Sequence, residues 1–197
     1  MNRRFLFLSL LTALMCGPPQ TGIAAPSSKS APKLLGTFGE WKANSYEGDQ
    51  AVCYMTLSVR FAPNKKVKRG MAWLTITHRP GENSKDVVSY ASGYNFKLLS
   101  DVTATIGKKS FDLFTAKDTA WSRDSATDHA LAAAIREGSS IKIAGTPDAK
   151  GAIMVTDTFS LKGAAAAYQA IGKACGYAVE TPSKPPPSHK KPMKTGH

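Results

Sequence analysis

The stretch Cys53-Tyr54-Met55-Thr56-Leu57-Ser58-Val59 alternates apolar and polar side chains with a period of two. Because successive side chains of a β-strand point to opposite faces, this alternation predicts a strand with one buried face. Similar patterns of β-forming residues predict further strands along the chain, at residues 74–77, 86–91, 102–106, 110–114, 141–143 and 152–161.

Glycine and proline residues separate these segments, at Gly70, Pro80-Gly81, Gly93, Gly107 and Pro147. Many short strands at this spacing favour an antiparallel sandwich or barrel over a parallel α/β sheet. The sequence therefore predicts a mostly β domain.

Two segments depart from the alternation and predict short helices. Residues 128–137 are rich in helix-forming residues, and Thr127 or Asp128 is the expected N-cap. Residues 163–174 are rich in alanine, and helical spacing turns Cys175, just after them, toward the buried side. We therefore expect two helices beside the strands.

The N-terminus carries the three parts of a secretion signal. Arg3 and Arg4 form a positive segment, residues 5–15 form an apolar segment, and small residues follow up to Ala24, where we expect cleavage. The apolar segment is shorter than the roughly 20 residues of a transmembrane helix. A lipoprotein is the alternative suggested by Cys16, but the preceding residue is larger than lipoproteins have there, so we assign Cys16 to the signal at residues 1–24.

Composition divides the rest of the chain into three parts. Residues 25–33 are predicted to be a flexible leader, and residues 34–180 have the length of one domain. Residues 181–197 are rich in proline and lysine and contain almost no apolar side chains. Such a segment cannot offset its ordering entropy by burial, so we expect a disordered basic tail.

Two cysteines remain after removal of the signal, Cys53 and Cys175. In an oxidising compartment they allow one intramolecular pairing, so a disulfide is expected. The chain-entropy model predicts that closing a loop of about 120 residues stabilises the fold by roughly 4–5 kcal/mol. A metal site is the alternative, but neither cysteine has a histidine or a third cysteine near it in the sequence.

The chain is strongly basic, with 26 Lys and Arg against 14 Asp and Glu and a formal net charge of +12. Loss of Arg3 and Arg4 with the signal leaves +10. This charge favours anionic partners, and outside the cytoplasm we expect envelope polymers or lipid headgroups rather than nucleic acid. The alternative is that the charge only keeps the protein soluble. The candidate anion-binding residues lie in one loop and in the tail: Lys65, Lys66, Lys68, Arg69, Lys184, Lys190, Lys191 and Lys194.

No cluster in the sequence indicates catalysis. Ser125, Asp128 and His129 are the residue types of a catalytic triad, but neighbours on one helix do not face one another in the required geometry. His78 is interpreted as a strand-end residue rather than a general base. The sequence also lacks the common motifs for nucleotides and metals, so we expect no enzyme activity, no cofactor and no metal.

The aromatic residues have two interpretations, the core of a small β domain or the lining of a binding face. The core is the more common place for aromatic residues in a domain of this kind. The residues concerned are Trp41, Tyr46, Tyr54, Trp73, Tyr90, Tyr94, Phe96 and Trp121.

A series of short segments in a fixed order resembles a known family. Phe38-Gly39-Glu40-Trp41 precedes Cys53-Tyr54, and Gly93-Tyr94-Asn95-Phe96 comes next. Later segments are Ile106-Gly107, Phe111-Asp112-Leu113-Phe114, Ala120-Trp121, Thr156-Asp157-Thr158-Phe159-Ser160-Leu161-Lys162-Gly163 and Ala167-Tyr168-Gln169-Ala170-Ile171, with Cys175 last. In order and spacing they are similar to the bacterial invasion-associated locus B family, in which proline is more usual at the position of Asn95 and tyrosine at that of Phe159.

The resemblance implies an immunoglobulin-like antiparallel β-sandwich with paired cysteines, exported to the periplasm or envelope of a Gram-negative bacterium. The family has no assigned catalytic residues and no established ligand. With the charge, this predicts a non-enzymatic envelope protein, peripheral to the membrane at most, that binds an anionic envelope component or a protein partner. The alternative is a secreted or surface-exposed factor in host-cell adhesion or invasion.

Overall fold

The computed structural model describes residues 31–48, 51–60 and 67–177. The predicted signal peptide and basic tail lie outside these ranges. Within them the chain forms ten strands, two α-helices and one 3-10 turn: β1 (Lys33–Phe38), β2 (Trp41–Tyr46), β3 (Val52–Val59), β4 (Ala72–Arg79), η1 (Pro80–Glu82), β5 (Ser84–Ala91), β6 (Val102–Ile106), β7 (Lys109–Ala116), β8 (Thr119–Trp121), α1 (Ser125–Glu137), β9 (Ser140–Gly145), β10 (Val155–Ser160) and α2 (Ala164–Ala174).

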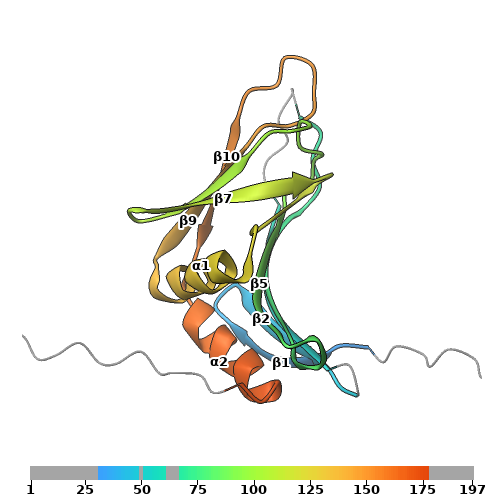
Figure 1. Cartoon of the computed structure of the whole chain (residues 1–197), viewed down its shortest axis with the longest axis vertical. Coiled ribbons are helices and arrows are strands. Elements are labelled where there is room, and N and C mark those ends of the chain that lie inside the picture. The colour runs from blue at the N-terminus through green and yellow to red at the C-terminus, as the bar shows by residue number, and fades with distance from the viewer. Residues whose placement is uncertain (1–30, 49–50, 61–66, 178–197) are drawn as a thin grey trace, which may run out of the picture.

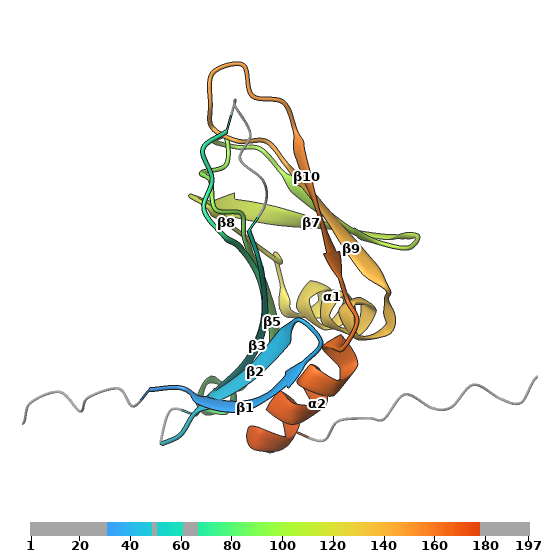
Figure 2. The ribbon, with the colours of Figure 1, turned by 180° about the vertical axis from the view of Figure 1, so that it is seen from behind.

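The strands form one antiparallel sheet that folds over on itself, in the order β1-β2-β3-β4-β5-β8-β7-β6-β9-β10. β7 pairs with both β8 and β6, so it joins the two halves. One layer consists of the strands β1, β2, β3, β4, β5 and β8, and β6, β9 and β10 lie across from it (Figures 1 and 2). The predicted fold class, a mostly β, immunoglobulin-like antiparallel sandwich with two short helices, is confirmed.

The predicted alternation determines which side chains enter the core. In β3 and β4, Met55, Leu57, Leu74 and Ile76 point inward and are almost fully buried, and their neighbours along each strand point outward. Ile141 of β9 belongs to the same core from the second layer. All the strands predicted from the sequence are present, within a few residues of the expected bounds.

The sequence pattern did not reveal β1, β2 and β8. In β2 the inward positions after Trp41 hold Ala43 and Ser45, which are too small and polar to give an apolar signal. β8 spans only three residues, of which Ala120 alone is buried. These strands form because their neighbours in the sheet satisfy their backbone hydrogen bonds, which local sequence does not report.

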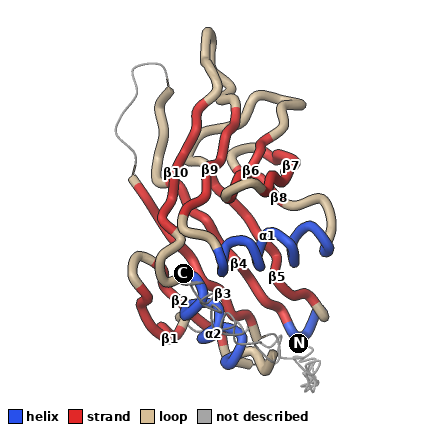
Figure 3. Tube along the Cα trace, turned by 90° about the vertical axis from the view of Figure 1, so that its left-hand side faces the viewer, coloured by secondary structure: helices blue, strands red, loops and turns tan. Residues whose placement is uncertain are grey.

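The predicted N-cap of α1 was wrong. Asp124 is the cap, and its carboxylate accepts a hydrogen bond of 2.7 Å from the backbone N–H of Thr127. The helix therefore begins at Ser125, and the side chain of Asp128 is free to accept a hydrogen bond of 2.9 Å from the backbone N–H of Val88. This contact fixes the start of α1 against β5, and Figure 3 shows that the helix lies beside that strand.

α2 matches the predicted helix and packs against β1, β2 and β3 (Figure 3). The chain turns sharply into it at Gly163, where φ is +94° and a Cβ atom would lie 2.1 Å from the carbonyl oxygen of Phe38. At the other end of the helix, Cys175 forms a disulfide with Cys53 of β3, across 122 residues. The predicted disulfide is confirmed.

The helices of the described ranges are too short and too polar to cross a lipid bilayer.

Candidate functional site

Four loops meet at the end of the sandwich away from α2, and we call this region the loop end (Figure 1). It comprises residues 67–71, 92–101, 117–118 and 146–154. Backbone hydrogen bonds of 2.8–2.9 Å connect these loops to one another, from Gly70 to Gly93, Ser92 to Asp118, Phe96 to Lys117, Lys97 to Thr146 and Asp148 to Asn95.

A buried ion pair supports the loop end from beneath. The guanidinium of Arg69 donates two hydrogen bonds, of 2.8 and 2.7 Å, to the carboxylate of Asp157, and a third of 2.6 Å to the carbonyl of Ser92. The hydroxyl of Tyr90 also donates to Asp157. Burial raises the pKa of Tyr90, and the hydrogen bond to Asp157 raises it further, so this tyrosine stays protonated and keeps its donor role.

Large apolar side chains protrude from the loop end. Leu98 and Leu99 are 83% and 93% exposed, and Ile153 and Met154 are 68% and 64% exposed. Leu99 also has a φ of +59°, a conformation that residues with a Cβ rarely adopt. Because these four side chains are exposed, they do not contribute to the hydrophobic core. The loops that carry them are joined by the hydrogen bond from Lys97 to Thr146, so they belong to one surface.

Lysines occur in the same group of loops as these apolar side chains. Lys68, Lys97, Lys117 and Lys150 are exposed in the loop-end segments, together with the acids Asp101, Asp118 and Asp148. Asp101 forms an exposed ion pair of 3.0 Å with Arg123, which neutralises its charge. The described part of the loop end thus carries exposed apolar side chains together with a moderate excess of lysines over acidic residues.

A second polar cluster lies at the opposite end, beneath the two helices, and we call this region the helix end. Asp86 is buried there, and its carboxylate accepts hydrogen bonds from the hydroxyl of Tyr168, at 2.5 Å, and from Nδ1 of His129, at 2.8 Å. The backbone N–H of Asp86 donates to Nδ1 of His78 at 3.1 Å. A β-bulge in β5 accompanies this arrangement: between the register pairs Thr77–Val87 and Arg79–Ser84, two residues of β5 lie opposite His78 alone, and such a bulge changes the facing of its strand.

His78 is fully buried, and burial lowers its pKa, although the nearby charge of Asp86 opposes the shift. The imidazole is therefore neutral near pH 7, with Nδ1 as acceptor and the proton on Nε2. Within the described ranges Nε2 has no hydrogen-bond partner, and the rings of Tyr168 and Tyr177 lie edge-on at centroid distances of 5.3 Å.

The helix-end cluster is incomplete as a catalytic site. Asp86 orients the imidazole of His129, as the acid of a catalytic triad does. However, no Ser, Thr or Cys side chain in the described part of the chain hydrogen-bonds His129. The same ranges contain no group of three His, Cys, Asp or Glu side chains that could hold a metal ion. The contacts instead connect α1 and α2 to β5.

Residues 41–172 match the family model described as invasion associated locus B (IalB) protein. This chain belongs to that family. The crystal structure of invasion associated protein B from Bartonella henselae is similar to the IalB-family fold described above, with a TM-score of 0.51 and 17% sequence identity. The similarity covers 74% of this chain and 98% of that chain, and at this identity it concerns the fold. No curated protein sequence matches the chain.

The structure of this IalB-family chain places few of the predicted anion-binding residues. Lys65, Lys66 and the four tail lysines, Lys184, Lys190, Lys191 and Lys194, lie outside the described residues. Lys68 is exposed at the loop end, whereas the guanidinium of Arg69 is turned inward to Asp157. Lys97, Lys117 and Lys150 were not singled out in the sequence, because they are isolated lysines rather than a run.

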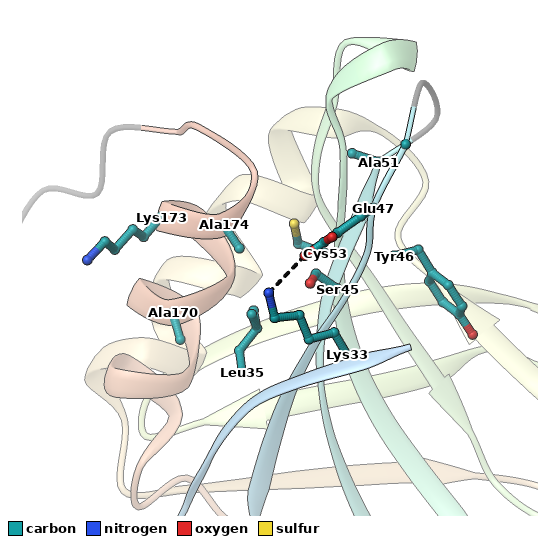
Figure 4. Close-up of a pocket in the computed structure, with 11 residues that line it drawn as sticks. Lys33, Leu35, Ser45, Tyr46, Glu47, Ala51, Cys53, Ala170, Lys173 and Ala174 are labelled. Atoms are coloured by element: carbon teal, nitrogen blue, oxygen red, sulfur yellow. Dashed lines mark hydrogen bonds and ion pairs between the residues drawn. The ribbon is translucent and has the colours of Figure 1, made fainter. Parts of the chain in front are cut away.

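A groove of about 570 Å³ lies beside the disulfide (Figure 4). It lies between α2 and the β1–β2 pair, and Ala170, Ala174 and Leu35 form much of its wall. An ion pair of 2.9 Å between Lys33 and Glu47 crosses its mouth. These two charges neutralise each other, and Figure 4 shows that the side chain of Lys173, also in the lining, points away from the groove, so the groove offers little to an anion.

Proposed function

We propose that this chain is an exported envelope protein of the IalB type that binds an anionic membrane surface through its loop end, without catalysing a reaction. The observation that carries the proposal is the exposure of Leu98, Leu99, Ile153 and Met154 beside lysines. Membership of the IalB family supports an envelope role, and the N-terminal sequence supports export.

Peripheral binding to a lipid surface combines two forces, and both are available at the loop end. Apolar side chains enter the boundary between headgroups and acyl chains. Each Leu, Ile or Met side chain that becomes fully buried contributes roughly 1.5–3 kcal/mol. Each lysine near an anionic surface adds about 1 kcal/mol. Lys97 precedes Leu98 and Leu99 directly, and Lys150 belongs to the loop of Ile153.

The form of the surface favours lipid as the occupant. The apolar side chains stand on protruding loop tips, and a protein partner would need a matching pocket for each of them. A lipid layer adapts its shape to a protruding side chain, so it requires no such match.

The test is binding of the mature chain, residues 25–197, to vesicles of phosphatidylglycerol and phosphatidylcholine in a sedimentation assay. We expect binding at low ionic strength that weakens as salt rises to physiological levels, because salt screens the lysines. The double variant L98S/L99S should reduce the bound fraction at least tenfold. Trp73→Ala is the matched control, because it removes an exposed apolar side chain outside the loop end and should leave binding unchanged.

Absence of binding to anionic vesicles at low salt would overturn the proposal. Equal losses in L98S/L99S and in Trp73→Ala would also contradict it, because the loop end would then have no particular role.

A role in host-cell adhesion or invasion is the second candidate, and the description of the family favours it. It requires the protein to reach the outer cell surface. Protease added to intact cells should then digest it, whereas a protein confined to the periplasm would be protected until the outer membrane is opened.

A further inference from the structure

The outward face of the first layer differs from the rest of this basic protein, and we call it the outer face. It consists of the outward side chains of β3, β4, β5 and β8 and of the adjoining part of β7, on the side turned away from the helices. Figures 1 and 2 show that this layer curves along its strands, so that the outer face is concave.

One row of side chains crosses all five strands of the outer face. The register places Thr56 beside Thr75, Thr75 beside Ser89, Ser89 beside Trp121 and Trp121 beside Phe114. Neighbouring strands lie about 4.8 Å apart, so the row spans roughly 19 Å. The hydroxyls of Thr56 and Thr75 lie 3.2 Å apart and share a hydrogen bond, which aligns them along the row.

The adjacent rows extend the same chemistry. Trp73 lies between Ser58 and Ala91 in the row toward the loop end, and Tyr54 lies beside Thr77 in the row toward the helices. Trp73 is 42% exposed and Phe114 is 39% exposed, although each could have been a polar residue without loss to the core. Aromatic rings thus stand on three sides of a strip of hydroxyl groups.

The outer face carries no charge at any of these described positions. This is notable in a chain with 26 Lys and Arg and 14 Asp and Glu, because the outward positions of a sheet are where charged residues commonly lie. Charged side chains flank these rows: Lys42 lies directly beside Thr56, Arg79 stands at the end of β4, and Asp112 precedes Phe114 by two residues on the same face of β7. Within the rows themselves, an anionic or cationic partner would gain no complementary charge.

We propose that the outer face binds an uncharged oligosaccharide chain. Serine and threonine hydroxyls both donate and accept hydrogen bonds, as sugar hydroxyls do. The faces of aromatic rings are electron-rich and attract the polarised C–H groups on the flat side of a pyranose. The core of a protein–protein interface is depleted in serine, whereas Ser58, Ser89 and the threonines beside them supply hydroxyl groups throughout these rows.

The test is titration of the mature chain with cellohexaose and with the hexamer of N-acetylglucosamine, followed by amide NMR shifts. We expect saturable shifts in β3, β4, β5 and β8 with at least one of the two sugars. Trp73→Ala should weaken that binding at least tenfold, and Thr75→Val, which keeps the side-chain volume, severalfold. Leu99→Ala is the matched control and should leave the sugar affinity unchanged.

Failure of both hexamers to bind would overturn the proposal, as would sugar binding that Trp73→Ala does not weaken. A dimer in sedimentation analysis that Trp73→Ala dissociates would assign the face to a second copy of this chain and would equally overturn it. Vesicle binding through the loop end is independent of these results, because Trp73→Ala is expected to leave it intact.

Discussion

The loop end and the helix end each bury one carboxylate, but they compensate it differently. At the loop end, Asp157 is held by the permanent charge of Arg69, through two hydrogen bonds. At the helix end, Asp86 is held by the hydroxyl of Tyr168 and by His129, and the disulfide adds a covalent link between β3 and α2. One end is therefore fixed by an ion pair, and the other by a covalent bond and a cluster containing two histidines.

The difference shows how the sandwich keeps two unlike surfaces in place. The ion pair holds the loop of Arg69 from the inside, which leaves the residues around it free to face outward. The helix end directs its polar groups inward and covers them with α1 and α2. Stability should consequently respond to reduction and pH at the helix end, and to loss of a single cation at the loop end.

The largest effect is expected from removal of the disulfide. Loss of a cross-link that closes a loop of this length should destabilise Cys53→Ala/Cys175→Ala by about 4–5 kcal/mol in the chain-entropy model. Urea denaturation measures the change in the free energy of unfolding. Hydrogen exchange should show faster exchange in α2, with the loop end still protected. Equal acceleration of hydrogen exchange at both ends would show that the disulfide does not stabilise the helix end in particular.

The second effect is expected from Arg69→Met. Removing one partner of a buried ion pair leaves an uncompensated charge on Asp157, at a cost of about 3–5 kcal/mol. Arg123→Met is the matched control, because its pair with Asp101 is exposed and should contribute less than about 1 kcal/mol. Similar losses in the two variants, measured by urea denaturation, would contradict the assignment of Arg69 as the support of the loop end.

The smallest effect is a dependence of stability on pH at the helix end. Burial lowers the pKa of His78 in the folded protein below its ordinary value of 6.5. At a pH below 6.5 the unfolded chain therefore binds a proton at this residue more readily than the folded protein does. Stability from neutral His78 is therefore complete above about pH 6.5 and is lost as the pH falls toward the folded pKa. The expected loss is at most about 1.4 kcal/mol per pH unit.

Melting temperatures between pH 7 and pH 5 measure this dependence in the wild type and in His78→Gln. The variant should show a flatter curve, because glutamine does not titrate. An unchanged slope in His78→Gln would show that the pH dependence arises elsewhere, and the contrast between the two ends would then rest on the disulfide alone.

Sequence patterns predicted the elements that bury one apolar face, and they predicted little of the contacts between distant polar residues. The alternation at residues 53–59 predicted β3 because apolar side chains occupy each inward position. Asp86 and Asp157 occupy inward positions too, but their partners Tyr168 and Arg69 lie 82 and 88 residues away. No local pattern connects such residues, so the sequence alone left these acids without partners and His78 without a role.

The candidate surfaces show the same division. The basic stretch around Lys65 and Arg69 was visible as a charge run, but the inward turn of Arg69 depends on Asp157. Leu98 and Met154 look like ordinary apolar residues until the fold leaves them outside the core. The aromatic residues had two interpretations, and the structure divides them: Trp41 and Tyr90 are core, whereas Trp73 is on the outer face.

The sequence by itself determined the β-sandwich class, the two helices, the cysteine pair and the family, because these depend on periodicity, composition and short ordered motifs. The tertiary structure decided which inward acids are paired, which apolar side chains remain exposed and which outward rows form a common surface. These properties depend on the register between strands and on contacts across more than 80 residues. Such contacts exist only once the sheet has folded over and brought its two ends into place.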